Sequence, residues 1–430
     1  MQHFNISILG FGTVGAGVYK ILTGNHDDIA HRDELDLGIG RILVRDFEHE
    51  PNLGLADRSL FTTDFSDIVN DPGTSIVVEC IGGVEPARTY ILKALNAGKT
   101  VVTSNKEVIS KHWPEFESAA KKTGAGLYIE ATVGGGIPIL KTVIDSMQAN
   151  NIQRIMGIIN GTTNYILTNM AESGVSFDEA LKQAQKLGYA EANPTADIEG
   201  FDATYKLSIL SSMSFHAHMP VEVIYREGIT KLTKDDFDFA KMLGYEIKLL
   251  AIGKKNGSSI EVRVHPTMLP KSHPLASVRG VFNAVFLTGH AVGDIMLYGQ
   301  GAGQLPTASA VVSDVIYACH ADGRHKYMTF RNEQKMTKDV HLVENFRCIY
   351  CIRVNVVDEP GTMAAISEVF ARHNVSLKDV LQLGSPEHGD SSRITFMTHE
   401  ANEFDIRDAL SEIEKLSCVH AIESMIRAEE

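Results

Sequence analysis

The stretch NISILGFGTVGAGVYKIL, from Asn5 to Leu22, constrains the fold more than any other part of the chain. An apolar strand leads directly into a glycine-rich turn, and a helical segment follows at once. The glycines have the spacing G-x-G-x-x-G, which permits a tight turn, close approach of a pyrophosphate to the backbone, and close packing of the helix on the strand. The alternative is a tight turn without a ligand. The residues expected to contact a dinucleotide are Gly10, Phe11, Gly12, Thr13, Val14 and Gly15.

The alternation of strands and helices continues after this loop. Apolar, strand-like segments end at Arg45, at Gly82–Gly83, at Asn105–Lys106 and at Glu130. Such alternation predicts an α/β fold of the Rossmann type, with a doubly wound parallel sheet. Ligands of these sheets bind beyond the carboxyl ends of the strands. We therefore expect these residues to surround one crevice.

Arg45 and Asp46 follow the second predicted strand. An acidic residue at this place bonds the ribose hydroxyls of NAD, whereas an arginine accommodates the 2′-phosphate of NADP. Both residue types are present, and Arg45 favours NADP, with NAD as the alternative. The competing interpretation is that Arg45 is a solvated loop charge.

Charge and cysteine content limit the classes of function. The formal net charge of −14 gives no general attraction to nucleic acid or to an anionic membrane surface. No apolar run approaches the roughly 18 to 20 residues needed to span a bilayer, and the first residues lack the order of a signal peptide. Five cysteines, few and odd in number, fit a reducing compartment. The sequence therefore predicts a cytoplasmic protein.

The segment GYAEANPTADIEGFDATYK carries a second constellation. Asp202 and Lys206 are four residues apart and share one face of a predicted helix, whose cap is Thr195 or Asp197. An exposed ion pair is one interpretation of this spacing. The helix continues as LSILSSMSF, which is apolar for a solvated surface, and Glu191 lies in the preceding loop. These features favour an acid/base site.

Several motifs in fixed order resemble the homoserine dehydrogenase family over about residues 5 to 325. They are GFGTVG, TSNK, EATVGGGIPI with GIINGTTNYIL, LGYAEANPTADIEGFDATYK, and GQGAGQLPTASAVVSDV. The resemblance implies the reversible NAD(P)H-dependent reduction of L-aspartate 4-semialdehyde to L-homoserine, in threonine, methionine and isoleucine biosynthesis.

The resemblance also implies residue roles. Lys206 would transfer the proton, Asp202 would orient the lysine and the substrate, and Glu191 would bind the substrate ammonium. Lys106 would lie between cofactor and substrate, and the residues leave open which of the two lysines transfers the proton. The backbones of Gly188 and Gly303 would approach the cofactor.

The family also has a monovalent cation, usually sodium, held by main-chain carbonyls of a glycine-rich bend. The matching positions here are Glu130, Val133, Gly135 and Ile137. Carbonyl oxygens suit a hard cation. Without the resemblance, a tight strand-to-helix corner explains the same residues.

Patterns beyond the first sheet predict further domains. Residues 131–303 are expected to form an α+β domain for substrate binding and dimerisation, and residues 304–325 to complete the nucleotide-binding domain of residues 1–130. Residues 326–348 read as a charged linker. Residues 349–430 show the order βαββαβ, which is the ferredoxin-like unit.

The turn DEPG at Asp358–Gly361, before the first helix of this unit, resembles that of an ACT domain. The resemblance implies feedback inhibition by L-threonine, and a dimer, or a tetramer through these domains. The alternative is a module that only adds a subunit contact. The residues expected to bind the effector are Asp358, Gly361, Thr362, Met363 and Asn374, with free amides at the helix start holding the carboxylate.

Two other functions remain open at this stage. One is a different NAD(P)-linked amino-acid dehydrogenase on the same fold. The other is a non-catalytic amino-acid sensor, which the presence of Glu191, Asp202 and Lys206 disfavours.

Overall fold

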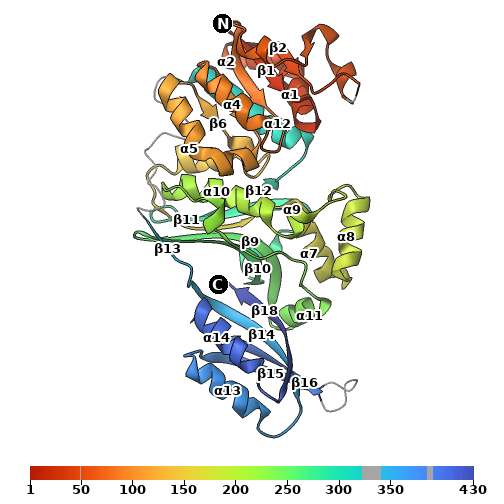
Figure 1. Ribbon diagram of the computed structural model, residues 1–430, viewed down its shortest axis with the longest axis vertical. Helices are drawn as coiled ribbons and strands as arrows, with labels where there is room; N and C mark the ends of the chain where they lie inside the picture. The colour runs from red at the N-terminus through yellow and green to blue at the C-terminus, as the bar shows by residue number, and fades with distance from the viewer. Residues whose placement is uncertain (49, 322–339, 385–390) are drawn as a thin grey trace.

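A computed structural model describes residues 1–48, 50–321, 340–384 and 391–430 of the protein. Figure 1 shows three regions along the longest axis, with the N-terminal region at one end and the C-terminal region at the other. None of the helices in the described part of the chain is both long and apolar enough to cross a bilayer.

The N-terminal region is built on a six-stranded sheet in which every pairing is parallel. The strand order β3-β2-β1-β4-β5-β6 is the order of a dinucleotide-binding Rossmann sheet, so the predicted fold class is confirmed. The strands are β1 (Gln2–Leu9), β2 (Leu35–Leu43), β3 (Phe61–Thr62), β4 (Thr74–Glu79), β5 (Thr100–Thr103) and β6 (Leu127–Tyr128).

Helices cover both faces of this sheet (Figure 1). They are α1 (Thr13–Gly24), α2 (His26–Asp33), α3 (Ser66–Val69), α4 (Ala87–Asn96), α5 (Lys106–Thr123) and, from much later in the chain, α12 (Gln304–His320). Helix α12 packs on α1, and Lys20 donates to the Gln304 side chain at 3.1 Å. The chain therefore returns to the first sheet after building the middle region.

The middle region is a mainly antiparallel sheet that continues into the C-terminal region, with one short strand, Tyr225–Arg226, paired in parallel. Its spatial order is β12-β11-β7-β9-β10, followed by β18-β14-β16-β15. The middle strands are β7 (Ile152–Ile158), β8 (Tyr225–Arg226), β9 (Tyr245–Asn256), β10 (Ser259–Pro270), β11 (Phe282–Gly289) and β12 (Gly293–Gln300). The helices are α6 (Ile139–Lys141), α7 (Gly161–Ser173), α8 (Phe177–Lys186), α9 (Thr195–Ile198), α10 (Phe201–Phe215) and α11 (Lys234–Met242).

Short helical turns complete these two regions. They are the 3₁₀ turns Leu53–Leu55, Arg58–Leu60, Glu130–Thr132, Val221–Val223 and Pro274–Ser277, and the π-helical turn Thr142–Ser146.

Helix α10 lies between α5 of the first region and the middle sheet, where it is almost entirely buried (Figure 1). Two of its serines tolerate this burial because their hydroxyls donate to backbone carbonyls: Ser211 to Leu207 and Ser212 to Ser208, each at 2.6 Å. The helix thus packs against α5 of the first region.

The C-terminal region has the predicted order βαββαβ, and its strand order β18-β14-β16-β15 is ferredoxin-like. The alternating residues predicted to form its first strand, from Tyr350 to Val356, are fully buried. Its elements are β14 (Arg347–Val357), α13 (Thr362–Arg372), β15 (Leu377–Gly384), β16 (Ser391–Thr398), β17 (Ala401–Asn402), α14 (Glu403–Ile413) and β18 (Val419–Ala428).

Residues 341–348, which sequence predicts to be linker, form ordered contacts with the middle region instead. Residues 326–339 of the predicted linker lie outside the residues that the structure describes. Strand β13 (His341–Leu342) pairs in parallel with β10, and Phe346 is buried against His265. Strand β14 then begins at Arg347. No local pattern indicates this contact, because the partner strand β10 lies some 80 positions earlier in the chain.

Buried charges join the middle and C-terminal regions. Strands β10 and β18 pair in parallel, so the two sheets are continuous. Arg427 on β18 is fully buried and donates to Glu403 at 2.5 and 2.8 Å and to Glu227 of the middle region at 3.0 Å. Arg263 on β10 is also fully buried and pairs with Glu429. Each buried cation therefore has a carboxylate partner from the other region.

Candidate active site

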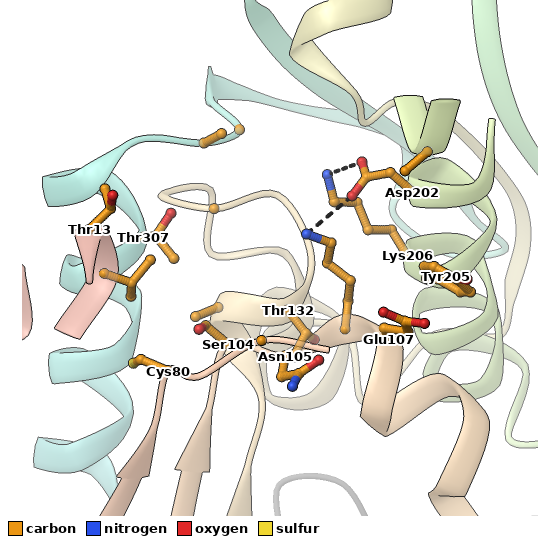
Figure 2. Close-up of a pocket in the computed structure, with 18 of the residues that line it drawn as sticks. Thr13, Cys80, Ser104, Asn105, Glu107, Thr132, Asp202, Tyr205, Lys206 and Thr307 are labelled. Carbon is orange, nitrogen blue, oxygen red and sulfur yellow. Dashed lines mark hydrogen bonds and ion pairs between the residues drawn. The ribbon is translucent and has the colours of Figure 1, made fainter. Parts of the chain in front are cut away.

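A cavity of about 500 Å³ lies where the first region faces α10. Figure 2 shows side chains converging on it from the glycine loop, from the ends of β4 and β5, from α10 and from the start of α12. Eleven of the residues that sequence placed at the site line it: Thr13, Val14, Gly82, Gly83, Asn105, Lys106, Gly135, Glu191, Asp202, Lys206 and Gly303.

The glycine loop is shaped to receive a phosphate group. A Cβ atom on Gly15 would lie 2.0 Å from the Gly10 carbonyl oxygen, so helix and loop touch through bare backbone. Gly12 caps α1 without any side-chain hydrogen bond, and a Cβ there would meet nothing within 4 Å. The first amides of α1 thus face open space, which fits the pyrophosphate of a dinucleotide.

Glu79 organises the backbone at the end of β4, and sequence reasoning overlooked it. Its carboxylate accepts hydrogen bonds from the Ile81 and Gly82 amides at 2.8 and 3.3 Å and from the Thr103 hydroxyl at 2.5 Å. Burial raises the pKa of Glu79, and these hydrogen bonds oppose the rise. The sequence signal was an acidic residue closing the apolar strand IVVE.

Asn105 fixes the start of α5 and thereby the position of Lys106. Its side-chain oxygen accepts from the Val108 amide at 3.2 Å, as a helix cap, and its amide group donates to the Gly83 carbonyl at 2.7 Å. Lys106 is therefore the first residue of a capped helix and projects toward α10.

Asp202 lies between two lysine ammonium groups (Figure 2). Lys206 donates to one carboxylate oxygen at 2.6 Å and to the Ile159 carbonyl at 2.8 Å. Lys106 approaches the other carboxylate oxygen at 3.2 Å. Asp202 and Lys206 are 7% and 8% exposed, so the interpretation as a surface ion pair is wrong.

The two ammonium groups control the ionisation of Asp202. Burial alone would raise its pKa, but the charges of Lys206 and Lys106 and the hydrogen bonds it accepts bring the pKa well below the ordinary value. In return, the charge of Asp202 raises the pKa of Lys106. At neutral pH the site therefore holds an aspartate anion and a protonated Lys106.

Asn160 and Asp197 belong to the same cluster, and sequence reasoning assigned neither to it. The Asn160 amide donates to Asp197 at 2.7 Å and to Asp202 at 2.9 Å. Burial and the charge of Asp202 raise the pKa of Asp197, which lines the cavity. Asp197 is not the cap of α10, because that helix begins at Phe201 after a left-handed Gly200. The Asn160 contact spans 42 positions and has no local signal.

Glu191 and Gly188 occupy the loop that leads to α9. Glu191 is exposed at the rim of the cavity, and its carbonyl accepts from Gln185. Gly188 ends the turn after α8 with a φ of +76° and is not among the residues that line the cavity. The roles of both in ligand binding stay predictions.

The predicted cation loop lies between the first region and α12. The Glu130 carboxylate is buried and accepts from the Leu140 and Lys141 amides at 3.0 and 2.7 Å, so this side chain is engaged by backbone. The Glu130 amide donates to buried Asp314 on α12. A Cβ on Gly135 would lie 2.5 Å from the Gly301 backbone, which requires glycine in the bend.

Glu130 gives the stability a pH dependence. Burial and the charge of Asp314 raise its pKa from 4.5 to about 8. The folded state therefore binds the Glu130 proton more tightly than the unfolded chain does. The stability that comes from this tighter proton binding is present below about pH 5 and is lost as pH rises to about 8. We expect the free energy of unfolding to fall by up to about 1.4 kcal/mol per pH unit over this window. Glu130→Gln should show a shallower decline in chemical unfolding at each pH. An identical slope would contradict the prediction.

Arg45 lies outside the cavity. It is exposed and lies directly beyond the carboxyl end of β2. The Val44 amide donates to the Thr62 carbonyl of β3, and the Gly10 amide donates to the Leu43 carbonyl, so Arg45 is next to the glycine loop. Its predicted contact with a 2′-phosphate stays a prediction.

The structure corrects one expectation for the effector turn, the free Thr362 amide, and restricts the role of Asn374, which stays a prediction. The Thr362 amide donates to the Glu359 carbonyl at 3.3 Å, so it is not free. Asn374 follows the C-terminal end of α13, about 16 Å from Gly361 at its start, because eleven residues rise about 1.5 Å each. Asn374 and Gly361 of one chain therefore cannot hold the same amino acid. Asp358 accepts from Gln382 at 3.3 Å.

Together, the Rossmann sheet with its open glycine loop, and the aspartate–lysine cluster across the cavity, define an NAD(P)-binding oxidoreductase. Models of three families match the chain. They are the NAD-binding domain of homoserine dehydrogenase over residues 10–130, homoserine dehydrogenase over 138–316, and the ACT domain over 352–418. The chain belongs to the homoserine dehydrogenase family.

Relatives and one solved structure match the chain over its full length, and a second solved structure matches about three quarters of it. Homoserine dehydrogenases from Bacillus subtilis and Synechocystis are 38% and 42% identical, with 98% or more of each chain covered. The crystal structure of a homoserine dehydrogenase from Thiobacillus denitrificans has a TM-score of 0.93 at 39% identity, covering 100% of this chain and 98% of that one. A hyperthermophilic archaeal homoserine dehydrogenase in complex with NADPH has a TM-score of 0.63 at 30% identity, covering 74% and 98%.

Proposed function

We propose that the protein reduces L-aspartate 4-semialdehyde reversibly to L-homoserine with NADPH as the preferred cofactor and NADH as the alternative. The observation that carries the proposal is the buried Asp202 carboxylate between Lys106 and Lys206, in a cavity shared with the glycine loop. A carbonyl oxygen placed beside these ammonium groups meets a proton donor at the point where negative charge develops.

The roles of the residues follow from their places. The amides at the start of α1, after Gly12, would hold the pyrophosphate, and the nicotinamide when bound supplies the hydride. Lys206 donates two of its N–H groups to Asp202 and Ile159, and its third would donate a proton to the substrate oxygen. Asp202 holds Lys206 in this orientation. Glu191, at the cavity rim, would bind the substrate ammonium.

Lys106 is the competing proton donor. It faces the same carboxylate, is more exposed than Lys206, and its raised pKa makes it hold its proton. A protonated Lys106 suits the stabilisation of charge between cofactor and substrate. Lys206, fixed by two acceptors, suits proton transfer at a defined point.

Arg45 would determine the preference for NADP. We expect Arg45→Ala to weaken NADP binding by about 1.5 to 3 kcal/mol, the range for a hydrogen bond to a charged group, and to leave NAD nearly unchanged. The measurement is the KM for each cofactor at saturating homoserine. Equal losses with both cofactors would assign Arg45 a structural role.

A monovalent cation, sodium, would bind the main-chain carbonyls of Glu130, Val133, Gly135 and Ile137. Gly134 and Gly135 are consecutive left-handed residues, which gives the bend an irregular backbone. The Glu130 and Ile137 carbonyls also accept from the Val133 and Ile139 amides at 3.3 and 2.8 Å, so each would offer the cation its second lone pair. Its role would be to hold the loop against the cavity wall.

The wider setting is also proposed. The enzyme would act in the cytoplasm in threonine, methionine and isoleucine biosynthesis, as a homodimer or as a tetramer through its ACT domains. The ACT domain would bring feedback inhibition by L-threonine, since a ligand that binds one conformation more tightly shifts the enzyme toward it.

The test is to follow the absorbance of reduced cofactor with purified protein, homoserine, and NADP or NAD in turn. Aspartate and other amino acids serve as competing substrates. Turnover of homoserine alone is expected, with a higher kcat/KM for NADP. Turnover of another amino acid in place of homoserine would favour a different dehydrogenase, and no turnover at all a sensor.

A further inference from the structure

The corner where β7 leads into α7 lies beside the aspartate–lysine cluster. The Ile159 carbonyl of this corner accepts from Lys206 at 2.8 Å. A Cβ on Gly161 would lie 2.8 Å from the Val281 carbonyl oxygen, so the corner is in close contact with the chain before β11. Asn160, between them, is buried and is not among the residues that line the cavity. Any effect of Asn160 on the reaction must therefore act through its neighbours.

Every polar atom of the Asn160 side chain has a partner. Its oxygen accepts from the Thr163 amide at 2.8 Å and from the Thr163 hydroxyl at 3.0 Å, which caps α7. Its nitrogen donates to Asp197 at 2.7 Å and to Asp202 at 2.9 Å. Ionised carboxylates only accept hydrogen bonds, so the opposite orientation of the amide would not satisfy these partners. The helix cap thus fixes the direction of the two N–H groups.

The two N–H groups act on a pair of like charges. Burial and the charge of Asp202 raise the pKa of Asp197, and the hydrogen bond from Asn160 opposes that rise because it favours the anion. A neutral amide stabilises both carboxylates without adding a third cation beside Lys106 and Lys206.

The same amide orients Asp202. Asn160 and Lys206 both donate to its Oδ2 atom, at 2.9 and 2.6 Å. The Oδ1 atom is thereby left to face Lys106 at 3.2 Å. Because the position of Oδ2 sets the direction of the Lys206 ammonium, loss of the Asn160 amide would change where Lys206 offers its third proton.

We propose that Asn160 is a positioning residue of the dehydrogenase reaction, which holds Asp202 in the orientation that directs Lys206 and binds Asp197 next to it. The inference rests on the proposed function, because the direction of Lys206 matters for the rate only if Lys206 transfers the proton. The other titratable groups that line this part of the cavity are Lys106 and Glu107 on α5, Tyr205 on α10, and Glu191 in the loop before α9.

Two substitutions in the full-length protein separate the amide from the helix cap. Asn160→Ser keeps an oxygen that can cap α7, but its side chain is one bond shorter and does not reach the two carboxylates. Asn160→Ala removes both the cap and the donor. Ser176→Ala removes the capping box of the neighbouring α8, outside the cavity, and is the control for the loss of a cap. Thermal unfolding, and the pH dependence of steady-state kinetics with homoserine and NADP, are measured for each variant.

We expect kcat to fall about tenfold or more in both Asn160 variants, as for a lost hydrogen bond to a charged group, with a nearly unchanged KM for NADP. The acid limb of the pH profile should move to higher pH in both, because Asp197 loses a donor that favours its anion. Ser176→Ala should lower only the unfolding temperature. A normal kcat and pH profile in Asn160→Ser, with losses confined to Asn160→Ala, would overturn the proposal and leave Asn160 as a cap alone.

A second measurement does not depend on turnover. Acetylation of lysines by acetic anhydride, followed by mass spectrometry, reports how firmly each ammonium is held. Relative to exposed Lys234, Lys206 should react faster in both Asn160 variants, since Asp202 no longer holds it in place. Unchanged labelling of Lys206 in Asn160→Ser would overturn the inference. If the unmodified protein does not oxidise homoserine, the proposed function fails, and the labelling still decides whether Asn160 acts on Lys206 through Asp202.

Discussion

Replacing Lys206 by alanine is expected to lower kcat by about 10² to 10⁴, the usual contribution of a positioned acid or base. The physical reason is that the Lys206 ammonium is fixed by Asp202 at 2.6 Å and by the Ile159 carbonyl at 2.8 Å, so its third proton has one direction in which to be donated. The KM for the cofactor should change little. Steady-state kinetics with homoserine and NADP measure both quantities.

Lys106→Ala is the matched comparison, because Lys106 binds the other oxygen of the same carboxylate. If Lys206 transfers the proton, Lys106→Ala should mainly raise KM and keep a pH profile like that of the unmodified enzyme. A folded Lys206→Ala enzyme with near-normal kcat would transfer the role to Lys106. Comparing the two pH profiles of kcat identifies which ammonium titrates in the reaction.

Replacing Arg427 by alanine is expected to destabilise the protein by about 3 to 5 kcal/mol, since it removes a buried cation and leaves the buried Glu403 carboxylate with only the half-exposed Arg407 as its cation. Arg427 is fully buried and is the partner of Glu403 and Glu227, which belong to different regions. Guanidinium unfolding followed by circular dichroism gives the free energy. Loss of the C-terminal region alone would appear as a separate early transition.

Arg407→Ala serves as the control. Arg407 pairs with the same Glu403 at 2.8 Å, but its side chain is 46% exposed, so its removal should cost less than about 1 kcal/mol. Equal losses of unfolding free energy in the two variants would show that the burial of Arg427 does not increase its contribution to stability.

The contacts between β10 and the C-terminal region also predict the effect of removing that region. A chain that ends before β14 would leave the edge of β10 at Thr267–Met268 unpaired and Arg263 without Glu429. We therefore expect such a chain to be unstable, and point variants are the better test of regulation.

Local patterns were enough for the nucleotide-binding fold and for the ACT fold. The spacing of Gly10, Gly12 and Gly15 indicates, within six residues, a turn that only glycine backbones allow. The alternation of apolar residues from Tyr350 to Val356 indicates a strand with one buried face. The i, i+4 spacing of Asp202 and Lys206 likewise placed them on one helix face. Each of these features depends on neighbours in the chain, so the sequence determined them by itself.

Tertiary structure alone decided the rest of the site. Lys106 reaches Asp202 because α5 and α10 pack together, and Asn160 joins Asp197 to Asp202 across about 40 positions. The pairing of β10 with β18, which makes the ACT sheet a continuation of the middle sheet, is equally non-local. Residue types limit which partners are possible, but long-range contacts form only when the packing of whole elements brings those partners within hydrogen-bonding distance, and no short window of sequence contains that information.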